Sequence, residues 1–176
     1  AAQPLVRSSY DFPRYTFEVN TLGTINILNI LNEIKFVKTG LIITTDKVYL
    51  NNNKKNFFKE NDTLGGQDPY SSSKSLAELA IYSYINSFFK KKNIFVASAR
   101  AGNVIGGGDF SKDRIVPDYF RAFKKKKLYL RQPKSIRPWQ HVIDPLYGYL
   151  LLLKKLHEKK RYKEYTWNFG PKTYNN

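Results

Sequence analysis

A tyrosine and a lysine four residues apart, Tyr70 and Lys74, are well suited to removing a proton from an alcohol. A phenol has a pKa of about 10, so it acts as a base near neutral pH only when a cation stabilises its anion. Side chains four residues apart share one face of a helix, which would bring the lysine to the phenol. Thr45 ends a predicted strand, where ligands of parallel sheets bind, and we expect its hydroxyl to position the same substrate. Together the three residues predict proton transfer at a sugar or alcohol hydroxyl.

The spacing of this pair is weak evidence by itself. With 13 tyrosines and 22 lysines in 176 residues, chance alone produces about two such pairs. The place of the pair in the chain adds weight, because it opens a helix after a buried strand and the polar connection 51–67. Long connections at the carboxyl ends of strands tend to be functional.

Helical and strand patterns alternate along the chain. The predicted helices are 21–35, a helix opened by Asp68 and continuing over 74–92, one within 109–127, and 144–160; the predicted strands are 41–45, 94–99, 128–130 and 165–169. Residues 7–15 are predicted to form a surface loop or a short helix. Short apolar strands without alternation are typical of parallel sheets covered on both faces, so the pattern predicts a doubly wound α/β fold.

The apolar spacing of three helices also predicts which side chains face the core. We expect these to be Leu22, Ile25, Leu28, Leu31 and Ile34 of the first helix, with Ile27 and Ile30 widening its stripe, Leu76, Leu79, Ala80, Ile85 and Phe88 of the second, and Leu146, Leu150, Leu153 and Leu156 of the last.

Composition limits the other classes of function. The chain has a net charge of +16 and no cysteine, which excludes disulfides and thiolate metal sites. A basic chain raises nucleic acid or an anionic membrane as partners. The lysine runs, however, lie at predicted helix ends, where the helix dipole favours cations. We therefore predict no nucleic-acid partner, no membrane partner and no metal, and a cytoplasmic location, because no signal or membrane-spanning pattern is visible.

A second cluster of candidate residues follows the strand 94–99. Three glycines at 106–108 would let backbone amides approach a phosphate or a sugar, although a glycine cluster after a strand is often a plain turn. Arg137 offers a planar fork for phosphate oxygens, with a surface ion pair as the alternative. His141 follows closely, and a structural histidine is the alternative there.

Three stretches of the chain together resemble a known family. They are Thr-Asp-Lys at 45–47, Gly-Gly-x-Asp-Pro-Tyr-Ser-x-Ser-Lys at 65–74 and Ala-Arg-Ala-Gly-Asn-Val-Ile-Gly-Gly-Gly-Asp at 99–109. This pattern resembles the extended short-chain dehydrogenase/reductase family, and within it the nucleotide-sugar 4,6-dehydratases that act on CDP-glucose. The resemblance runs from residue 1 to about residue 170 and implies a Rossmann-like sheet.

The resemblance implies an NAD-dependent lyase that converts CDP-glucose to CDP-4-keto-6-deoxyglucose, through oxidation at C4, loss of water across C5 and C6, and return of hydride to C6. Tyr70 would take the proton of the C4 hydroxyl, with Lys74 lowering its pKa and Thr45 positioning the hydroxyl. Asp46 would protonate the departing C6 oxygen. Lys47 stands where related enzymes carry the C5 base, and a lysine serves as a base only if its pKa is lowered.

The same resemblance assigns residues that would bind ligands. For NAD they are Ala1, Ala2, Gln3, Arg100 and Ala101, beside Tyr70 and Lys74. For the nucleotide sugar they are Asn103, Arg114, Arg131, Arg137 and His141. The resemblance further implies a homo-oligomer, a dimer or a tetramer, and a place in deoxysugar synthesis for lipopolysaccharide O-antigen.

We expect the chain to be an internal fragment, because no Gly-x-x-Gly-x-x-Gly turn follows a first strand to hold a pyrophosphate. Residues 1–105 would belong to the NAD-binding domain, and 106–176 to a mixed segment that binds substrate and returns to the sheet. Two alternative functions remain: a sugar-nucleotide 4-epimerase or another sugar-nucleotide dehydratase, which share Tyr70 and Lys74, and a basic nucleic-acid-binding protein.

Overall fold

The structure is a computed structural model, and it describes residues 2–51, 57–123, 127–130, 133, 135, 137–159 and 164–171. Its helices are α1 (Val6–Asp11), α2 (Pro13–Phe17), α3 (Gly23–Glu33), α4 (Pro69–Tyr84), α5 (Lys90–Lys92), α6 (Ile115–Phe123) and α7 (Ile143–Lys159). Its strands are β1 (Thr39–Ile43), β2 (Phe95–Ala101), β3 (Val104–Ile105), β4 (Gln140–His141) and β5 (Thr166–Phe169). π-helical turns at Glu18–Leu22 and Ile85–Phe89 join neighbouring helices, and a 3₁₀ turn spans Asp46–Val48.

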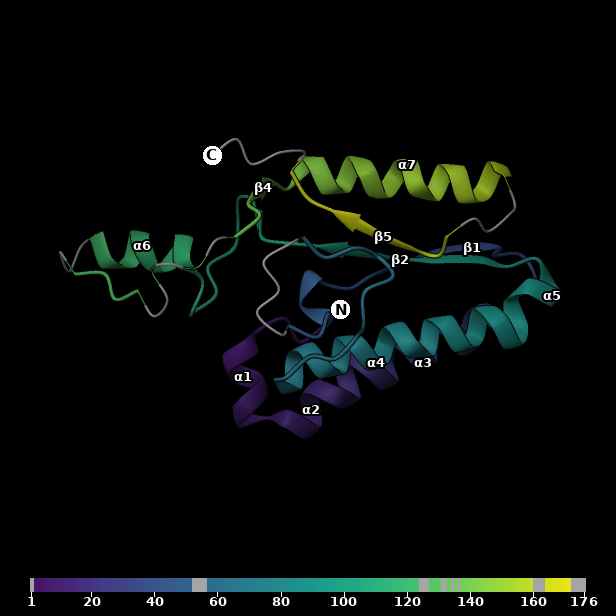
Figure 1. The fold of residues 1–176 in the computed structure, drawn as a ribbon, viewed down its shortest axis with the longest axis horizontal. Coiled ribbons are helices and arrows are strands. Elements are labelled where there is room, and N and C mark those ends of the chain that lie inside the picture. The colour runs from purple at the N-terminus through teal and green to yellow at the C-terminus, as the bar shows by residue number, and fades with distance from the viewer. Residues whose placement is uncertain are drawn as a thin grey trace.

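A parallel sheet of three strands, in the order β1-β2-β5, lies between two helical layers (Figure 1). α7 covers one face, and α3 and α4 lie side by side on the other. Thr39 pairs with Phe95, and Ser98 pairs with Thr166. Because the strands are parallel, their carboxyl ends share one edge, where ligands of such sheets bind. The predicted α/β fold with a covered parallel sheet, Rossmann-like, is confirmed.

The sheet has a separate apolar core on each face. Side chains alternate along β2, so Phe95 and Ala97 meet α7 while Val96 meets the other layer. The cluster on the α7 side contains Phe95, Ala97, Leu152 and Leu156. The cluster on the other side contains Leu28, Leu31, Ile81, Ile85, Phe89, Ile94 and Val96. Burial on both faces explains why the strands show no polar alternation.

The predicted core face of α4 was wrong in phase. Leu76, Leu79 and Phe88 are exposed, whereas Ile85 is buried as expected. The buried residues of α4 are Tyr70, Ser71, Ser73, Lys74, Ser75, Ala77, Glu78 and Ile81. Most of these are polar, so apolar spacing could not locate the face that the sheet covers.

The predicted core face of α7 was also rotated. Leu146 and Leu150 are exposed, and Leu152 and Leu156 pack on the sheet. The cause is Gly148, where an added Cβ would lie 2.5 Å from the Phe169 ring, so the helix turns its glycine toward β5. In α3 the expected burial of Leu28 and Leu31 is confirmed, but Ile27 and Ile30 are exposed, and so is Leu22 in the π-helical turn before α3.

Two local predictions also differ from the structure. Residues 128–130 form no strand, and the short parallel pairing in this part of the chain joins β3 to β4. Residues 7–15, predicted as a loop or a short helix, lie in α1 and α2. Within the described part of the chain, no helix combines the length and the hydropathy that crossing a bilayer requires.

Two adjacent phenylalanines in the turn after α4, Phe88 and Phe89, test which face of this helical segment packs on the sheet. Phe89 is 0% exposed and Phe88 is 43% exposed. Phe89→Ala is expected to lower the free energy of unfolding by about 3–5 kcal/mol, because it opens a cavity in the core. Phe88→Ala is the matched control, with a loss below about 1 kcal/mol. Urea unfolding measures both, and equal losses would contradict the observed phase.

Candidate active site

The start of α4 is fixed by its first residues. Asp68 accepts hydrogen bonds from the Ser71 backbone N–H at 3.0 Å and from its hydroxyl at 2.6 Å, which caps the helix. Pro69 occupies the first turn, where its missing N–H has no cost. Gly66 lies against the same turn, and an added Cβ there would be 2.3 Å from the Ser71 carbonyl carbon. Tyr70 is therefore held in the first turn of the helix.

Tyr70 and Lys74 are both buried beside the end of β1. Each is less than one-tenth exposed. The Tyr70 backbone N–H donates to the Ser9 hydroxyl at 3.2 Å, which ties the helix start to α1. The Lys74 ammonium donates to the Ile43 carbonyl at 3.3 Å, on the last residue of β1. This contact places Lys74 at the carboxyl edge of the sheet.

Thr45 and Asp46 follow β1 and form the opposite side of this site. The Thr45 hydroxyl donates to Asp46 Oδ1 at 3.2 Å and accepts from the Lys47 backbone N–H at 3.4 Å. The Thr45 side chain also lies close enough to the Tyr70 phenol to lower its pKa. The structure therefore brings together Thr45, Asp46, Tyr70 and Lys74 from two elements.

Burial shifts the pKa values of the acids upward. It raises the pKa of the Tyr70 phenol, although the nearby Thr45 side chain and the charge of Arg114 lower that pKa in part. Burial also raises the pKa of Asp46, against the opposing effects of Thr45, Lys47 and Arg137. Both shifts favour the neutral, proton-carrying forms.

Burial shifts the pKa values of the two lysines downward. It lowers the pKa of Lys74, and the charge of Glu78 opposes this in part. Although the Lys47 side chain meets solvent, the surrounding protein lowers its pKa, with Asp46 opposing the shift and Arg137 adding to it. The Lys47 ammonium lies 5.8 Å from the centroid of the Tyr70 ring. The site therefore combines a buried phenol and a partly buried carboxylate with lysines that lose their protons more readily than usual.

A short parallel pairing brings the second predicted cluster to the same edge. β3 pairs with β4, so that Val104 faces Gln140 and Ile105 faces His141, and the Gln140 N–H donates to the Asn103 carbonyl at 3.0 Å. Gly102 permits the approach, because an added Cβ would lie 2.5 Å from Pro138 Cγ.

The predicted substrate residues do not all behave alike. Arg137 and Arg114 lie near enough to act on the charges of the site, and Arg114 also pairs with Asp109 at 3.5 Å. His141 accepts from the Ile143 N–H at 3.3 Å, which supports the alternative of a structural histidine. Arg131 lies outside the described residues.

The predicted cofactor residues are largely committed to contacts within the protein. Gln3 is buried, and its side chain donates to the Thr16 hydroxyl at 2.8 Å. Arg100 is buried and paired with Glu78. Ala2 is exposed and Ala101 is buried, while Ala1 lies outside the described residues. Contact of these residues with a dinucleotide stays a prediction.

The sequence analysis missed Glu78, a buried carboxylate one helical turn beyond Lys74. It accepts from Thr44, Ser98 and Arg100. The available signal was its spacing, since residues 70, 74 and 78 share one helix face.

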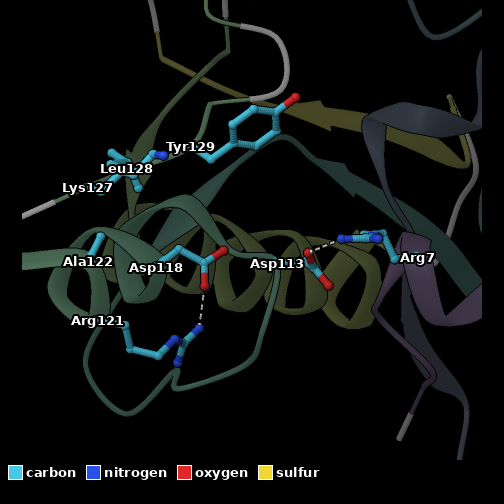
Figure 2. Close-up of a pocket in the computed structure, with 8 residues that line it drawn as sticks. All are labelled: Arg7, Asp113, Asp118, Arg121, Ala122, Lys127, Leu128 and Tyr129. Atoms are coloured by element: carbon cyan, nitrogen blue, oxygen red, sulfur yellow. Dashed lines mark hydrogen bonds and ion pairs between the residues drawn. The ribbon is translucent and has the colours of Figure 1, made fainter. Parts of the chain in front are cut away.

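A separate hollow of about 660 Å³ lies between α1 and the region of α6 (Figure 2). Arg7 pairs there with Asp113 at 2.8 Å, and Arg121 pairs with Asp118 at 2.6 Å. The residues that line it are Arg7, Asp113, Asp118, Arg121, Ala122, Lys127, Leu128 and Tyr129. This lining includes neither Tyr70 nor Lys74, so the hollow is distinct from the site at β1.

The chain is similar in sequence and in fold to known proteins. The model of the GDP-mannose 4,6 dehydratase family matches residues 1–168. CDP-glucose 4,6-dehydratase of Salmonella typhimurium is 44% identical over 98% of this chain, which covers 50% of that protein. UDP-glucose 4-epimerase of Mycoplasma pneumoniae is 26% identical, with 97% of this chain and 54% of that protein covered.

Among solved structures, dTDP-glucose 4,6-dehydratase of Bacillus anthracis in complex with NAD is similar, with a TM-score of 0.73 and 25% identity. The match covers 98% of this chain and 50% of that one. The chain thus spans about half the length of the relatives that it matches.

The buried lysine makes a prediction about pH. Because the pKa of Lys74 is lower in the folded than in the unfolded chain, its charged form opposes folding. This penalty is complete below the lowered pKa and disappears as pH rises through it toward the ordinary 10.5. Lys74→Met should therefore be more stable than the parent at about pH 7, with the difference shrinking toward about pH 10. Urea unfolding at several pH values measures this, with the exposed Lys91→Met as control. A loss of stability at neutral pH would contradict the prediction.

Proposed function

Because the chain belongs to the GDP-mannose 4,6-dehydratase family, we propose that it carries the catalytic edge of an enzyme that dehydrates a nucleotide-activated hexose. The observation that carries this proposal is the meeting of two segments at the end of β1: the buried Tyr70 and Lys74 of α4, with Lys74 bonded to the Ile43 carbonyl, and Thr45, whose hydroxyl donates to Asp46 Oδ1. An alcohol oxidation needs a group that takes a proton, and a loss of water needs a group that gives one. Tyr70 and Asp46 supply both within one site.

We propose NAD as the cofactor. The similar dehydratase of Bacillus anthracis is described in complex with NAD. The donor set here fits such a group, because an ammonium has three N–H donors and Lys74 directs one to Ile43, so it can also serve ribose hydroxyls. NAD supplies a reversible hydride acceptor when it is bound. In this proposal Ala1, Ala2, Gln3, Arg100 and Ala101 border the cofactor.

Tyr70 is the proposed base for the C4 hydroxyl of the sugar. Its burial favours the neutral phenol, so its anion depends on nearby cations. Arg114 and Lys47 lie near it, and Lys74 follows one turn later in the helix. Thr45 orients the hydroxyl toward the phenol. Holding these groups in place supplies the proximity that proton transfer needs.

Asp46 and Lys47 are proposed for the elimination of water. The raised pKa of Asp46 keeps a proton available for the departing C6 oxygen. The lowered pKa of Lys47 makes a neutral amine more accessible, and such an amine can accept the C5 proton. Adjacent positions in the 3₁₀ turn let both residues reach neighbouring carbon atoms of one sugar.

We propose CDP-glucose as the substrate, and the 44% identity to the Salmonella typhimurium enzyme supports this choice. Asn103, Arg114, Arg131 and Arg137 would bind the diphosphate and the sugar, with His141 nearby. We keep the division at residue 105 as a proposal, because β4 after it pairs with β3 outside the main sheet, whereas β5 returns to that sheet. The cytoplasmic location and the link to lipopolysaccharide O-antigen stay predictions.

A sugar-nucleotide 4-epimerase is the second candidate, and the 26% identity to such an enzyme of Mycoplasma pneumoniae supports it. An epimerase also oxidises C4 with the Tyr and Lys pair. It expels no water and therefore needs no acid at Asp46.

An Asp46→Asn variant of the intact protein separates the two candidates. For a dehydratase we expect the rate of 4-keto-6-deoxy product formation to fall by about 100-fold or more, because the leaving oxygen loses its acid. Oxidation at C4 should persist, and the absorbance of the reduced cofactor measures it. The assay compares CDP-glucose with dTDP-glucose and UDP-glucose, and the first should react fastest.

The exposed Asp11→Asn in α1 is the control and should leave the product profile unchanged. An unchanged profile in Asp46→Asn would sink the dehydratase assignment. Formation of a C4 epimer without water loss would favour the second candidate.

We also propose that the protein self-associates through the outer face of α3 and α4. The two helices lie side by side, and Thr21 in the π-helical turn before α3 donates to the Ser73 carbonyl of α4 at 2.8 Å. Ile27, Ile30, Leu76 and Leu79 are nonetheless exposed on them. A flat pair of helices that meets its own copy forms a four-helix bundle, which is a self-complementary contact.

Light scattering after gel filtration tests this contact in the intact protein. Leu79 is 52% exposed, and Leu79→Glu should convert the dimer to a monomer, because it places a charge in the apolar contact. Leu150→Glu on the other helical layer, where Leu150 is 66% exposed, should leave the dimer intact. A parent protein that is monomeric, or a Leu79→Glu dimer, would rule this contact out.

A further inference from the structure

One face of α4 carries three buried side chains at steps of four residues: Tyr70, Lys74 and Glu78. We propose that Glu78 is a positioning residue. By accepting a hydrogen bond from Thr44, it sets the distance between the neighbouring Thr45 and Tyr70. This inference rests on the proposed function, because it assigns Glu78 a part in the same reaction. Glu78 would not touch the substrate.

Glu78 is only 4% exposed, and both oxygens of its carboxylate accept hydrogen bonds from neighbouring side chains. One carboxylate oxygen accepts from the Thr44 hydroxyl at 2.5 Å and from Arg100 Nε at 3.0 Å. The other accepts from the Ser98 hydroxyl at 2.7 Å and from Arg100 Nη2 at 3.1 Å. Both ends of the carboxylate are thus fixed by β2, while Thr44 ties it to the end of β1.

The Arg100 guanidinium is itself fixed in place, because Nη1, which does not contact Glu78, donates to two other residues. Nη1 donates to the Tyr49 hydroxyl at 2.8 Å and to the Glu60 carbonyl at 3.0 Å. The Tyr49 hydroxyl in turn donates to Asn168 Oδ1 at 2.6 Å, at the carboxyl end of β5. A planar guanidinium with contacts on two sides fixes the place of its partner.

The hydrogen bond between Glu78 and Thr44 acts on the site through the backbone, because Thr44 directly precedes Thr45. Thr44 and Thr45 are consecutive, so their Cα atoms are about 3.8 Å apart and the first fixes the position of the second. The Thr44 N–H also donates to the Ala99 carbonyl at 2.8 Å, which holds this residue to β2. Lys74 grips Ile43 just before it. α4 therefore holds the two residues that directly precede Thr45.

A salt bridge that only stabilises the fold is the competing explanation. The two hydroxyls that serve Glu78 separate the explanations, because each donates one hydrogen bond to the same buried carboxylate. Thr44 adjoins a site residue, whereas Ser98 lies in the middle of β2. A structural role makes them equivalent, and a positioning role does not.

The test compares Thr44→Val with Ser98→Ala in the intact protein. Hydrogen exchange in the peptide that covers 44–49 is followed by mass spectrometry, with the melting temperature measured beside it. Thr44→Val should exchange about fivefold faster there, and Ser98→Ala should match the parent at a similar loss of melting temperature. The kcat of Thr44→Val should fall about tenfold with little change in KM, since small misplacements of reacting groups are costly.

Thr44→Ser keeps the hydroxyl and should restore both exchange and kcat. Equal exchange in Thr44→Val and Ser98→Ala would overturn the positioning role, and so would a failure of Thr44→Ser to restore it. The exchange measurement needs no turnover, so it decides this inference even if the parent protein forms no dehydration product, a result that would count against the proposed function alone.

Discussion

A carboxylate that leaves water must regain its hydrogen bonds from the protein, and Glu78 regains them from Ser98 and Arg100 of β2 and from Thr44, directly after β1. Breaking a buried ion pair such as that of Glu78 with Arg100 costs about 3–5 kcal/mol, so α4 has one stable register over β1 and β2. Tyr70 and Lys74 belong to the same helix and inherit that register. The geometry of the candidate site thus depends on an ion pair behind it.

The same burial that fixes the site also gives it its acid and base character. The pKa values of Tyr70 and Asp46 rise, and those of Lys74 and Lys47 fall, since a low-dielectric environment disfavours every charged form. Asp46 and Lys47 are thereby brought closer in proton affinity, which favours proton exchange between them and a sugar. Stability is given up for this, because a charged lysine in such a place opposes folding.

The parallel arrangement of the strands collects residues that are far apart in the chain. Thr45, Arg100 and Asn168 follow or end β1, β2 and β5 and meet at one edge of the sheet. Beyond that edge, the β3 and β4 pairing adds Asn103 and the segment 137–141. A sheet of this kind therefore offers side chains from several distant segments to one ligand.

The sequence by itself determined the elements and the local parts of the site. Asp68 and Pro69 mark the start of α4, and the apolar run before Thr45 marks a buried strand, because caps and periodicity depend on near neighbours. Tertiary structure alone decided that Phe89 rather than Phe88 is buried, that Glu78 meets Arg100, and that Gly148 faces Phe169. These outcomes depend on which surfaces meet, and a polar face buried through long-range hydrogen bonds leaves no apolar period in the sequence.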